Sequence, residues 1–517
     1  MPNSSSVLTL IVAILAAACS VEAPDYDVLI VNGTVYDGSL SAARIANIGI
    51  IDDRIVSMAA SATASAVTRI DATGRMVTPG FIDPHTHARQ FLLDPASNSN
   101  LNYLYQGVTT VFIGNDGGGF PDRDASIDKL RRQGTGPNVA FFAGHGAIRE
   151  LVMGMADRAA NSEEIAAMQE LLVDDMEAGA LGLSSGLYYA PGSYAPTEEV
   201  IALARVAAHY GGVYDTHLRS EGSYGEGLLA AVSEAIDIAR AANIPLHISH
   251  IKALGQDTWG QSVEIIRLVE QGLDSGVDIS ANQYPWSASG TRLSNALIPR
   301  WVVADSNDRM RDRLTDPELS NRIRTEMQAN LLRRGGPDAM LVTGADSEFV
   351  GMTLEEISRV LEKPPLEAAI DVVLQGDPSI ASFVMDAADI RRLAVQPWVM
   401  TGSDGGAGHP RLYGTYPKAF RDFVVDSALM SREQFVHRSS GLVAETFGLC
   451  DRGYLREGYI ADIAIIDADT FIARASYARP TALATGVDQL LVNGVLAIDG
   501  ASRPALPGRV LRKTLCN

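Results

Sequence analysis

Apolar and polar residues alternate along this chain in two different patterns. Short runs with alternating apolar positions occur near both ends: DVLIVNGTVYDG and IGIIDDRIVSM at the start, ADIAIIDAD and QLLVNGVLAIDG at the close. Such alternation is typical of strands, and the two Asn-Gly pairs in these runs predict tight turns between strands. We therefore predict one small β domain, a β-sandwich, assembled from residues 26–76 and 453–510.

The central part of the chain, residues 77–452, has a different period. Amphipathic stretches such as SEEIAAMQELLVDDMEAG and GEGLLAAVSEAIDIARAA predict helices, because their apolar residues recur every three to four positions. They alternate with eight apolar runs: TPGFIDPH, VTTVFIG, VAFFAG, ALGLSSG, GGVYDTH, IPLHISH, VDISANQ and WVMTGSD. Eight buried strands alternating with helices favour an α/β fold with a closed (β/α)8 TIM-like barrel, and an open doubly wound sheet is the alternative.

Between the seventh and eighth runs the chain is long, from about residue 286 to 396. This segment contains the charged helical sequence DRMRDRLTDPELSNRIRTEMQANLLRR. We interpret it as a helical cap inserted over the mouth of the barrel.

The N-terminus carries a targeting pattern. Val7 to Ala18 is an apolar run that is too short to span a bilayer and has the size of a signal-peptide core. Small residues precede Cys19, so residues 1–19 resemble a bacterial lipoprotein signal, with a lipid anchor at Cys19; an ordinary cleaved signal peptide is the alternative. Either reading predicts export, to the periplasm or to a membrane-anchored position.

Composition narrows the function classes. With 46% hydrophobic and 20% charged residues, the chain is not of the disordered class. A net charge of −20, from 42 Lys+Arg against 62 Asp+Glu, argues against nucleic-acid binding. Three cysteines are too few for a disulfide framework or for a thiolate zinc site.

Metal-binding side chains fall at the ends of the predicted barrel strands, where barrel active sites are built. His85 and His87 end the first run, and as residues i and i+2 of a strand they point the same way. The other candidate ligands and the candidate acid–base group end further runs: Asp116 the second, His217 the fifth, His250 the sixth and Asp404 the eighth. The competing interpretation is a hydrogen-bonded rim histidine or, for the two aspartates, a helix N-cap. Together these positions predict a metal centre.

Several motifs, in this order, resemble the amidohydrolase superfamily and, within it, the D-aminoacylase (N-acyl-D-amino-acid deacylase) family: PGFIDPHTH, GVTTVFIGND, GLSSGLYYAPG, DTHLRSEG, HISHIKALG and TGSDGGAGHPRLYGTYP. The resemblance covers about residues 26–510 and implies a metal-bearing barrel beside a small β domain. It also implies roles for individual residues: His217 and His250 as tightly held zinc ligands, His85 and His87 at a second metal position, Asp404 as the catalytic aspartate, and Tyr189, Lys252 and Arg411 as substrate-binding residues.

One position departs from that family's pattern. The family usually has cysteine where this chain has Asp116, a harder ligand that can also bridge two metals. The fourth strand, ALGLSSG, has no lysine that could be carboxylated to form a bridge. Asp116 is therefore the best candidate for bridging, and the identity of the metal and its number, one or two ions, stay open.

These patterns lead to an expected reaction. A zinc ion can lower the pKa of its bound water to roughly 7 and so supply hydroxide, while Asp404 acts as general base and then as general acid. We expect a zinc-dependent amidohydrolase that deacylates N-acyl-D-amino acids, small molecules whose free carboxylate Arg411 can hold through two hydrogen bonds. The alternatives are amidohydrolases for D-residue dipeptides, cyclic amides or lactones. A metal-free scaffold protein is disfavoured because the candidate ligands are retained. The preferred acyl group, side chain and oligomeric state stay open.

Overall fold

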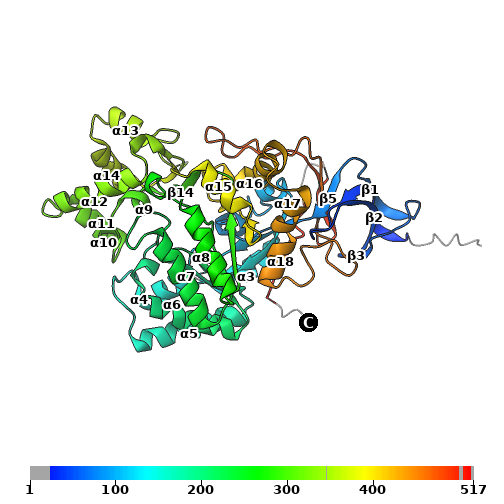
Figure 1. Ribbon diagram of the computed structural model, residues 1–517, viewed down its shortest axis with the longest axis horizontal. Helices are drawn as coiled ribbons and strands as arrows, with labels where there is room; N and C mark the ends of the chain where they lie inside the picture. The colour runs from blue at the N-terminus through cyan, green and yellow to red at the C-terminus, as the bar shows by residue number, and fades with distance from the viewer. Residues whose placement is uncertain (1–23, 121, 345, 500–504, 514–517) are drawn as a thin grey trace, which may run out of the picture.

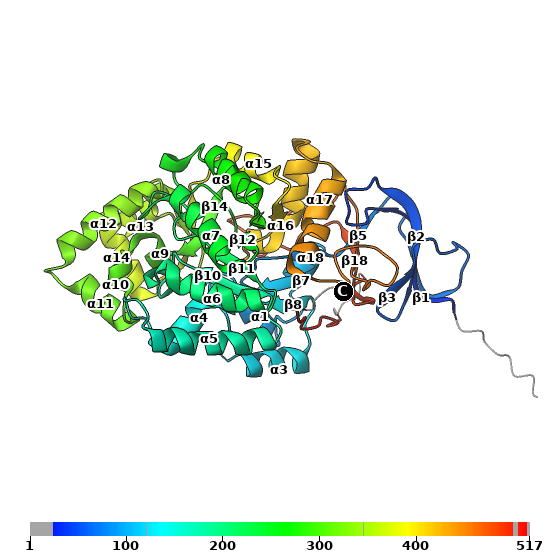
Figure 2. The same cartoon turned by 60° about the horizontal axis from the view of Figure 1, so that its bottom comes forward.

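The computed structural model describes residues 24–120, 122–344, 346–499 and 505–513. The predicted signal peptide and Cys19 lie outside these residues. Three parts follow one another along the longest axis of the molecule (Figure 1). A β domain lies at one end, the barrel lies in the middle, and the inserted segment lies at the other end, an arrangement that the turned view also shows (Figure 2).

Parallel strands form the barrel. Two of its sheets run β6-β7-β8 and β9-β10-β11-β12-β13-β17. A parallel bridge between Thr86 and Gly405 joins the first strand to the last, and only Phe142 separates β8 from β9. The predicted eight barrel strands are therefore confirmed, as β6 (Phe81–Asp83), β7 (Val108–Ile113), β8 (Asn138–Phe141) with β9 (Ala143–Gly144), β10 (Gly182–Gly186), β11 (Val213–His217), β12 (Leu246–Ile248), β13 (Ile279–Gln283) and β17 (Val399–Thr401).

Helices cover the outside of the barrel because each has one apolar face. In α5 the buried residues Met168, Leu172 and Met176 recur every four positions, and a capping box at Asn161 begins the helix. The helices of this part, α5 included, are α1 (Arg89–Leu93), α2 (Leu101–Leu104), α3 (Arg123–Gln133), α4 (His145–Met153), α5 (Ser162–Glu177), α6 (Thr197–His209), α7 (Leu228–Ala242), α8 (Ser262–Asp274), α15 (Ala387–Ala394), α16 (Arg411–Ala419), α17 (Arg432–Ser439) and α18 (Gly441–Phe447).

The β domain is built from both ends of the described chain. Its strands form one hydrogen-bonded path, β20-β19-β18-β5-β1-β2-β3, with β4 paired to β1. They are β1 (Tyr26–Val35), β2 (Arg44–Ile51), β3 (Arg54–Ser57), β4 (Ala66–Asp71), β5 (Met76–Pro79), β18 (Ile463–Ile466), β19 (Val487–Val492) and β20 (Val495–Ile498). Ile30 and Ile48 from the first segment pack with Ile463 from the second in one core.

The two Asn-Gly pairs adopt different structures. Asn493 and Gly494, with φ of 50° and 78°, form the expected turn between β19 and β20. At Asn32 and Gly33 the predicted turn is wrong, because β1 continues through them with a register shift. Pairing of β1 changes there from β4 to β5, and a Cβ on Gly33 would lie 2.4 Å from Val77 Cγ2. Close approach of β5, rather than chain reversal, therefore accounts for this glycine.

The inserted segment has its own hydrophobic core and covers the barrel mouth. Its helices are α9 (Leu293–Leu297), α10 (Arg300–Val303), α11 (Asn307–Thr315), α12 (Ser320–Arg333), α13 (Leu354–Val360) and α14 (Pro365–Gln375). It also contains an antiparallel sheet that the sequence analysis did not predict, made of β14 (Ala288–Arg292), β15 (Met340–Val342) and β16 (Ser379–Phe383). These strands are short and mostly lack apolar alternation, so the hydrophobic pattern gave no signal for them.

A buried polar network joins the β domain to the barrel. Arg452 forms an ion pair with Asp462, and its Nη2 donates to Asn493 Oδ1 at 2.8 Å. Asn138 on β8 donates its Nδ2 to Asp462 Oδ2 at 3.1 Å and accepts a hydrogen bond from Asn493 Nδ2 at 2.8 Å. The hairpin turn of one part is thereby fixed to a barrel strand of the other.

We expect replacement of Arg452 by methionine to lower the free energy of unfolding by about 3–5 kcal/mol, because Asp462 would be left as a buried charge without its partner. Equilibrium denaturant unfolding would measure the loss. The control is Arg456→Met, since Arg456 is exposed. Equal stability of the two variants would contradict the role assigned to the network.

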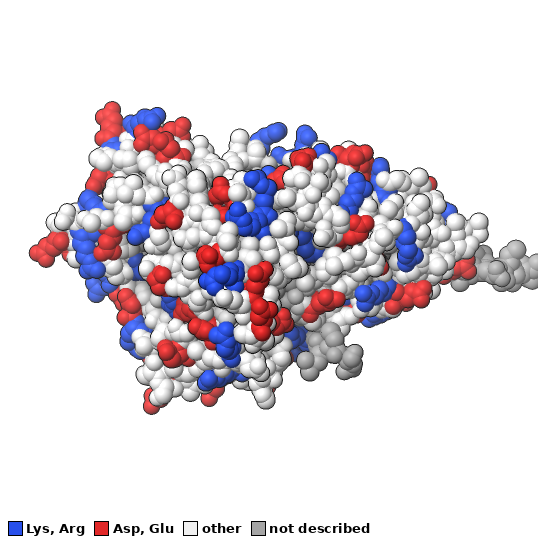
Figure 3. Space-filling view, viewed as in Figure 1, with Lys and Arg blue, Asp and Glu red and all other residues white. Residues whose placement is uncertain are grey.

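The distribution of charged side chains on the surface agrees with the presence of both acidic and basic residues in the sequence. Acidic and basic side chains are interspersed over the face of the molecule shown in Figure 3. Within the described part of the chain, we find no helix with both the length and the apolar character needed to cross a membrane.

Candidate active site

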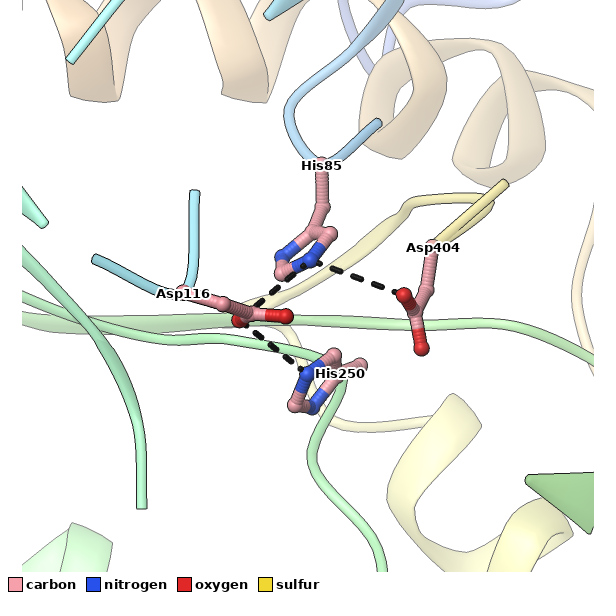
Figure 4. A group of neighbouring side chains, drawn as sticks. All are labelled: His85, Asp116, His250 and Asp404. Atoms are coloured by element: carbon pink, nitrogen blue, oxygen red, sulfur yellow. Dashed lines mark ion pairs between the residues drawn. The ribbon is translucent and has the colours of Figure 1, made fainter. Parts of the chain in front are cut away.

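Four side chains that follow barrel strands converge at the mouth of the barrel. His85 comes after β6, Asp116 after β7, His250 after β12 and Asp404 after β17, and one donor atom of each lies within 4.8 Å of the others (Figure 4). His85 Nε2 is 3.5 Å from Asp116 Oδ1 and 3.6 Å from Asp404 Oδ1. His250 Nε2 is 3.4 Å from the same Asp116 oxygen. Four predicted site residues thus share one cluster.

His217 belongs to a second group, which shares His250 with the first. His217, Glu221 and His250 also place donor atoms within 4.8 Å of one another. Glu221 Oε2 lies 3.6 Å from His217 Nε2, and its Oε1 lies 3.0 Å from His250 Nδ1. Glu221 is not among the residues predicted from the sequence, although it stands four residues after His217 in the motif DTHLRSEG.

His87 lies at the more open edge of the first group. Its Nε2 is 3.1 Å from Asp404 Oδ1 and 3.5 Å from Asp116 Oδ2, and 42% of its side chain is exposed. It borders a cleft of about 920 Å³ between the barrel mouth and the inserted segment, and Asp116, Tyr189, Asp404 and Arg411 line the same cleft. A small-molecule substrate therefore has space to reach these side chains.

Left-handed backbone conformations orient three of the four clustered donors. Asp116, His250 and Asp404 have φ of 56°, 34° and 47°. Such values are uncommon for residues other than glycine, and they concentrate at functional sites whose surroundings enforce them. Each lies where the chain leaves a strand, and the side chains of these three residues point toward one another (Figure 4).

The loop that carries Asp116 is fixed by close backbone contacts. A Cβ on Gly186, the last residue of β10, would lie 2.2 Å from the carbonyl oxygen of Asp116. On the other side, Arg89 donates from Nη1 to the carbonyl oxygens of Gly118 and Gly119. Arg89 thus braces the ligand loop.

We expect Gly186→Ala to displace Asp116, because the added methyl group overlaps its backbone. The cost of overpacking is about 1–3 kcal/mol, and we expect bound metal and kcat/KM to fall together. Metal analysis and steady-state kinetics would measure this. Gly376→Ala is the control, since a Cβ there meets no atom within 4 Å; an unchanged metal content in Gly186→Ala would contradict the expectation.

Carboxylates dominate the electrostatics of the site. Burial and the Lys252 ammonium group lower the pKa of His250, but Glu221, Asp404 and Asp116 outweigh them and raise this pKa to about 10. Burial raises the pKa of Asp404, yet Arg411 and His250 hold it well below its usual range. Asp404 is therefore ionised at neutral pH, and the cluster attracts a cation.

Two buried aspartates, also missed in the sequence, support the ligand-bearing turns. Asp83 Oδ1 accepts hydrogen bonds from the backbone N–H groups of Ser403, at 3.0 Å, and His85, at 3.2 Å. Asp215 accepts from the hydroxyl groups of Ser249 and Ser184, at 2.6 and 2.7 Å. Burial raises the pKa of each aspartate to about 7. The sequence signal that could have identified them is their position, since Asp83 stands two residues before His85 and Asp215 stands two residues before His217.

The three predicted substrate-binding residues lie around this cluster in different settings. Arg411 Nη1 is 2.7 Å from Asp404 Oδ2, and the guanidinium Nε has no hydrogen-bond partner among the described residues. Tyr189 is partly buried, with its ring edge-on to His217 at 4.8 Å between centroids. Lys252 donates to Glu221, and its Nζ lies 2.8 Å from His250 Nδ1, so in this structure it contacts candidate ligands.

The donor set fits a divalent metal ion. Both ring nitrogens of His85 and Oδ1 of Asp116 are buried without a hydrogen-bond partner in the described structure. Buried polar atoms are normally satisfied, and imidazole with carboxylate is a common ligand combination for zinc and other divalent metals. A bound ion would satisfy the Asp116 oxygen and one of the two His85 nitrogens, and it would offset the charge of the clustered carboxylates.

Comparisons with known proteins place the chain in a family. Residues 68–287 match the Amidohydrolase family. The chain is 33% identical to a D-aminoacylase from Alcaligenes xylosoxydans xylosoxydans over 95% of this chain and 98% of that protein. The crystal structure of an N-acyl-D-glutamate deacylase from Bordetella bronchiseptica, in complex with zinc and a phosphonate mimic of the tetrahedral intermediate, is 29% identical and superposes with a TM-score of 0.82 over 94% of this chain and 99% of that one.

A further structure, of a D-aminoacylase with a binuclear metal centre, is 30% identical and superposes with a TM-score of 0.81 over 94% of this chain and 100% of that one. The superposition extends over nearly the whole of each chain, so the overall fold agrees with these relatives. This chain belongs to the D-aminoacylase family of amidohydrolases.

Proposed function

We propose that this protein hydrolyses the amide bond of N-acyl-D-amino acids in a zinc-dependent reaction. The observation that carries the proposal is the position of Asp404, which lies both beside the metal-binding donors His85 and Asp116 and beside the Arg411 guanidinium. One carboxylate thus links a hydrolytic centre to a group that can hold a substrate carboxylate. Cyclic amides and lactones lack the free α-carboxylate that such a guanidinium recognises.

The roles of the side chains follow from their positions. Arg411 lines the cleft, so its planar guanidinium group can hold an α-carboxylate and set the register of the scissile amide. Asp404, kept ionised, can accept a proton from the attacking water and deliver it to the departing nitrogen. Tyr189 borders the cleft and can donate its hydroxyl to the acyl oxygen.

His85, Asp116 and His250 would hold the metal, and His217 with Glu221 would complete a second position that shares His250. A divalent ion bound there would lower the pKa of a coordinated water to about 7 and polarise the acyl carbonyl group. Lys252, through Glu221 and His250 Nδ1, would fix the orientation of the shared imidazole. The imidazole–carboxylate set favours zinc, and other divalent ions are compatible with it.

Release of free amine from paired N-acetyl-D- and N-acetyl-L-amino acids tests the proposal. We expect hydrolysis of the D-substrates only, together with bound zinc in the purified protein. Bound metal without release of amine from any D-substrate would overturn the substrate assignment. Dipeptides with a D-residue, cyclic amides and lactones would then be assayed.

We further propose that the chain is exported and carries a lipid at Cys19. The support is the pattern of residues 1–19 alone. Labelling of cells with a radioactive fatty acid would test it against a Cys19→Ala variant. Export of an unlabelled wild-type protein would identify an ordinary signal peptide instead.

A further inference from the structure

Arg334, the residue that follows α12 in the inserted segment, is a buried cation with neutral partners. It is 3% exposed. Its Nε donates to the Tyr224 hydroxyl at 2.8 Å, Nη1 to Ser289 Oγ at 3.2 Å and Nη2 to the Tyr188 hydroxyl at 3.3 Å. Across the described ranges, no carboxylate forms an ion pair with it. Burial of a charge is costly unless a counter-charge compensates it.

Other buried cations in the barrel are compensated. Lys252 pairs with Glu221, and Arg411 pairs with Asp404. Arg438 donates to the main-chain carbonyl oxygens of Ala394 and Met400, which are strong acceptors. Arg334 differs from them because its three partners are hydroxyl groups, so an anion would be a better partner than any it has.

Arg334 faces the candidate active site. It lines an inner cavity together with His217, Glu221, His250 and Lys252. The Tyr188 ring, whose hydroxyl accepts from Arg334, stacks on the His217 ring with 5.6 Å between centroids. The Tyr188 side chain therefore connects Arg334 to His217, a candidate metal ligand.

The inner cavity and the outer cleft meet at the reacting residues. Tyr189, Gly290, Thr291 and Asp404 line both. A substrate bound beside the Asp404–Arg411 ion pair in the cleft of about 920 Å³ can therefore extend a substituent toward Arg334. The inner cavity has a volume of only about 20 Å³, so a carboxylate entering it would displace the two phenol hydroxyls from the guanidinium.

A second cation, Arg300, lies beside the tyrosine that Arg334 contacts. Burial raises the pKa of Tyr188, but the Arg300 and Arg334 guanidinium groups outweigh burial and lower this pKa below its usual value. Arg300 lies over the Tyr188 ring, 4.1 Å from its centroid. Two guanidinium groups thus act on Tyr188, a residue that lines the inner cavity.

We propose that Arg334 binds a second carboxylate of the substrate, so that the enzyme prefers N-acyl-D-amino acids with an acidic side chain. The inference rests on the proposed function and narrows its substrate class. The names of the relatives do not determine whether this chain prefers acidic side chains, since they include both a D-aminoacylase and an N-acyl-D-glutamate deacylase. A carboxylate on the acyl group would supply the same chemistry from another part of the substrate.

The test compares kcat/KM for N-acetyl-D-glutamate with that for its neutral isostere N-acetyl-D-glutamine. We expect the wild-type ratio to exceed about 10, and Arg334→Met to reduce the ratio by about tenfold to a hundredfold, the usual worth of a charge-assisted hydrogen bond. Arg322→Met, which removes an exposed arginine from α12, is the matched control and should leave the ratio unchanged.

Two additions keep the test decisive. Arg334→Lys retains the charge, and its ratio should fall between those of the wild type and Arg334→Met; it replaces the methionine variant if that variant does not fold. A pair of N-succinyl-D-leucine and its succinamide analogue separates the two sources of the carboxylate. A preference in this pair alone would overturn recognition of the side chain.

Failure of the inference is distinguishable from failure of the proposed function. Equal hydrolysis of the glutamate and glutamine substrates, or a ratio that Arg334→Met leaves unchanged, would overturn the role of Arg334 while deacylation stands. If no D-substrate were hydrolysed, the proposed function would fail. Calorimetric binding of N-acetyl-D-glutamate and N-acetyl-D-glutamine would then decide the inference: tighter binding of the glutamate compound, lost in Arg334→Met, supports it, and equal binding overturns it.

Discussion

Asp404→Asn is expected to lower kcat/KM for N-acyl-D-amino acids by about 10²–10⁴, the contribution of a positioned general acid–base group. Asparagine has nearly the shape of aspartate but cannot accept the proton of the attacking water. His85, Asp116 and His250 remain in the variant, so we expect its metal content to match that of the wild type. Kinetics and metal analysis on the same preparation would measure both quantities.

A control for folding is needed because Asp404 pairs with the buried Arg411. Loss of that pair leaves the guanidinium without its counter-charge, and thermal unfolding would show whether the variant remains folded under the conditions of the assay. A folded, metal-bound Asp404→Asn protein with activity within about tenfold of the wild type would contradict the assigned proton transfer.

His250→Ala is expected to remove nearly all bound metal, because both donor groups contain His250. The metal supplies several kcal/mol of transition-state stabilisation, so we expect kcat/KM to fall by at least about a thousandfold. Removal of His85 or His217 alters only one group, and we expect each of those variants to retain more metal than His250→Ala. Elemental analysis after dialysis against a weak chelator would rank the three.

The matched control for this series is His437→Ala. His437 lies on α17, where its Nδ1 is 2.9 Å from the carbonyl oxygen of Gly38. It belongs to neither of the two donor groups. Its replacement should leave the metal content unchanged. Metal retained by His250→Ala at the level of His437→Ala would show that the two groups do not share a ligand.

The hydrophobic pattern was sufficient for the architecture but not for every turn. The eight apolar runs correspond to the barrel strands because strands buried on both faces need continuous apolar sequence, which is visible locally. Asn493-Gly494 forms the predicted hairpin turn, whereas Asn32-Gly33 lies within a strand. The dipeptide is the same, and the difference comes from Val77 on β5, which approaches Gly33.

Residue type and position along a strand were enough to predict which side chains converge at the barrel mouth. His85, Asp116, His250 and Asp404 stand at the ends of parallel strands, and parallel strands closed into a ring bring those ends together. Tertiary structure alone decided the grouping of donors, the left-handed turns that aim them, and the partners of Arg334. Those features depend on contacts between residues far apart in the sequence: Gly186 against Asp116, Arg411 against Asp404, and the inserted segment against Tyr188. No local pattern encodes such contacts, because they exist only once the barrel has closed and the inserted segment has folded over its mouth.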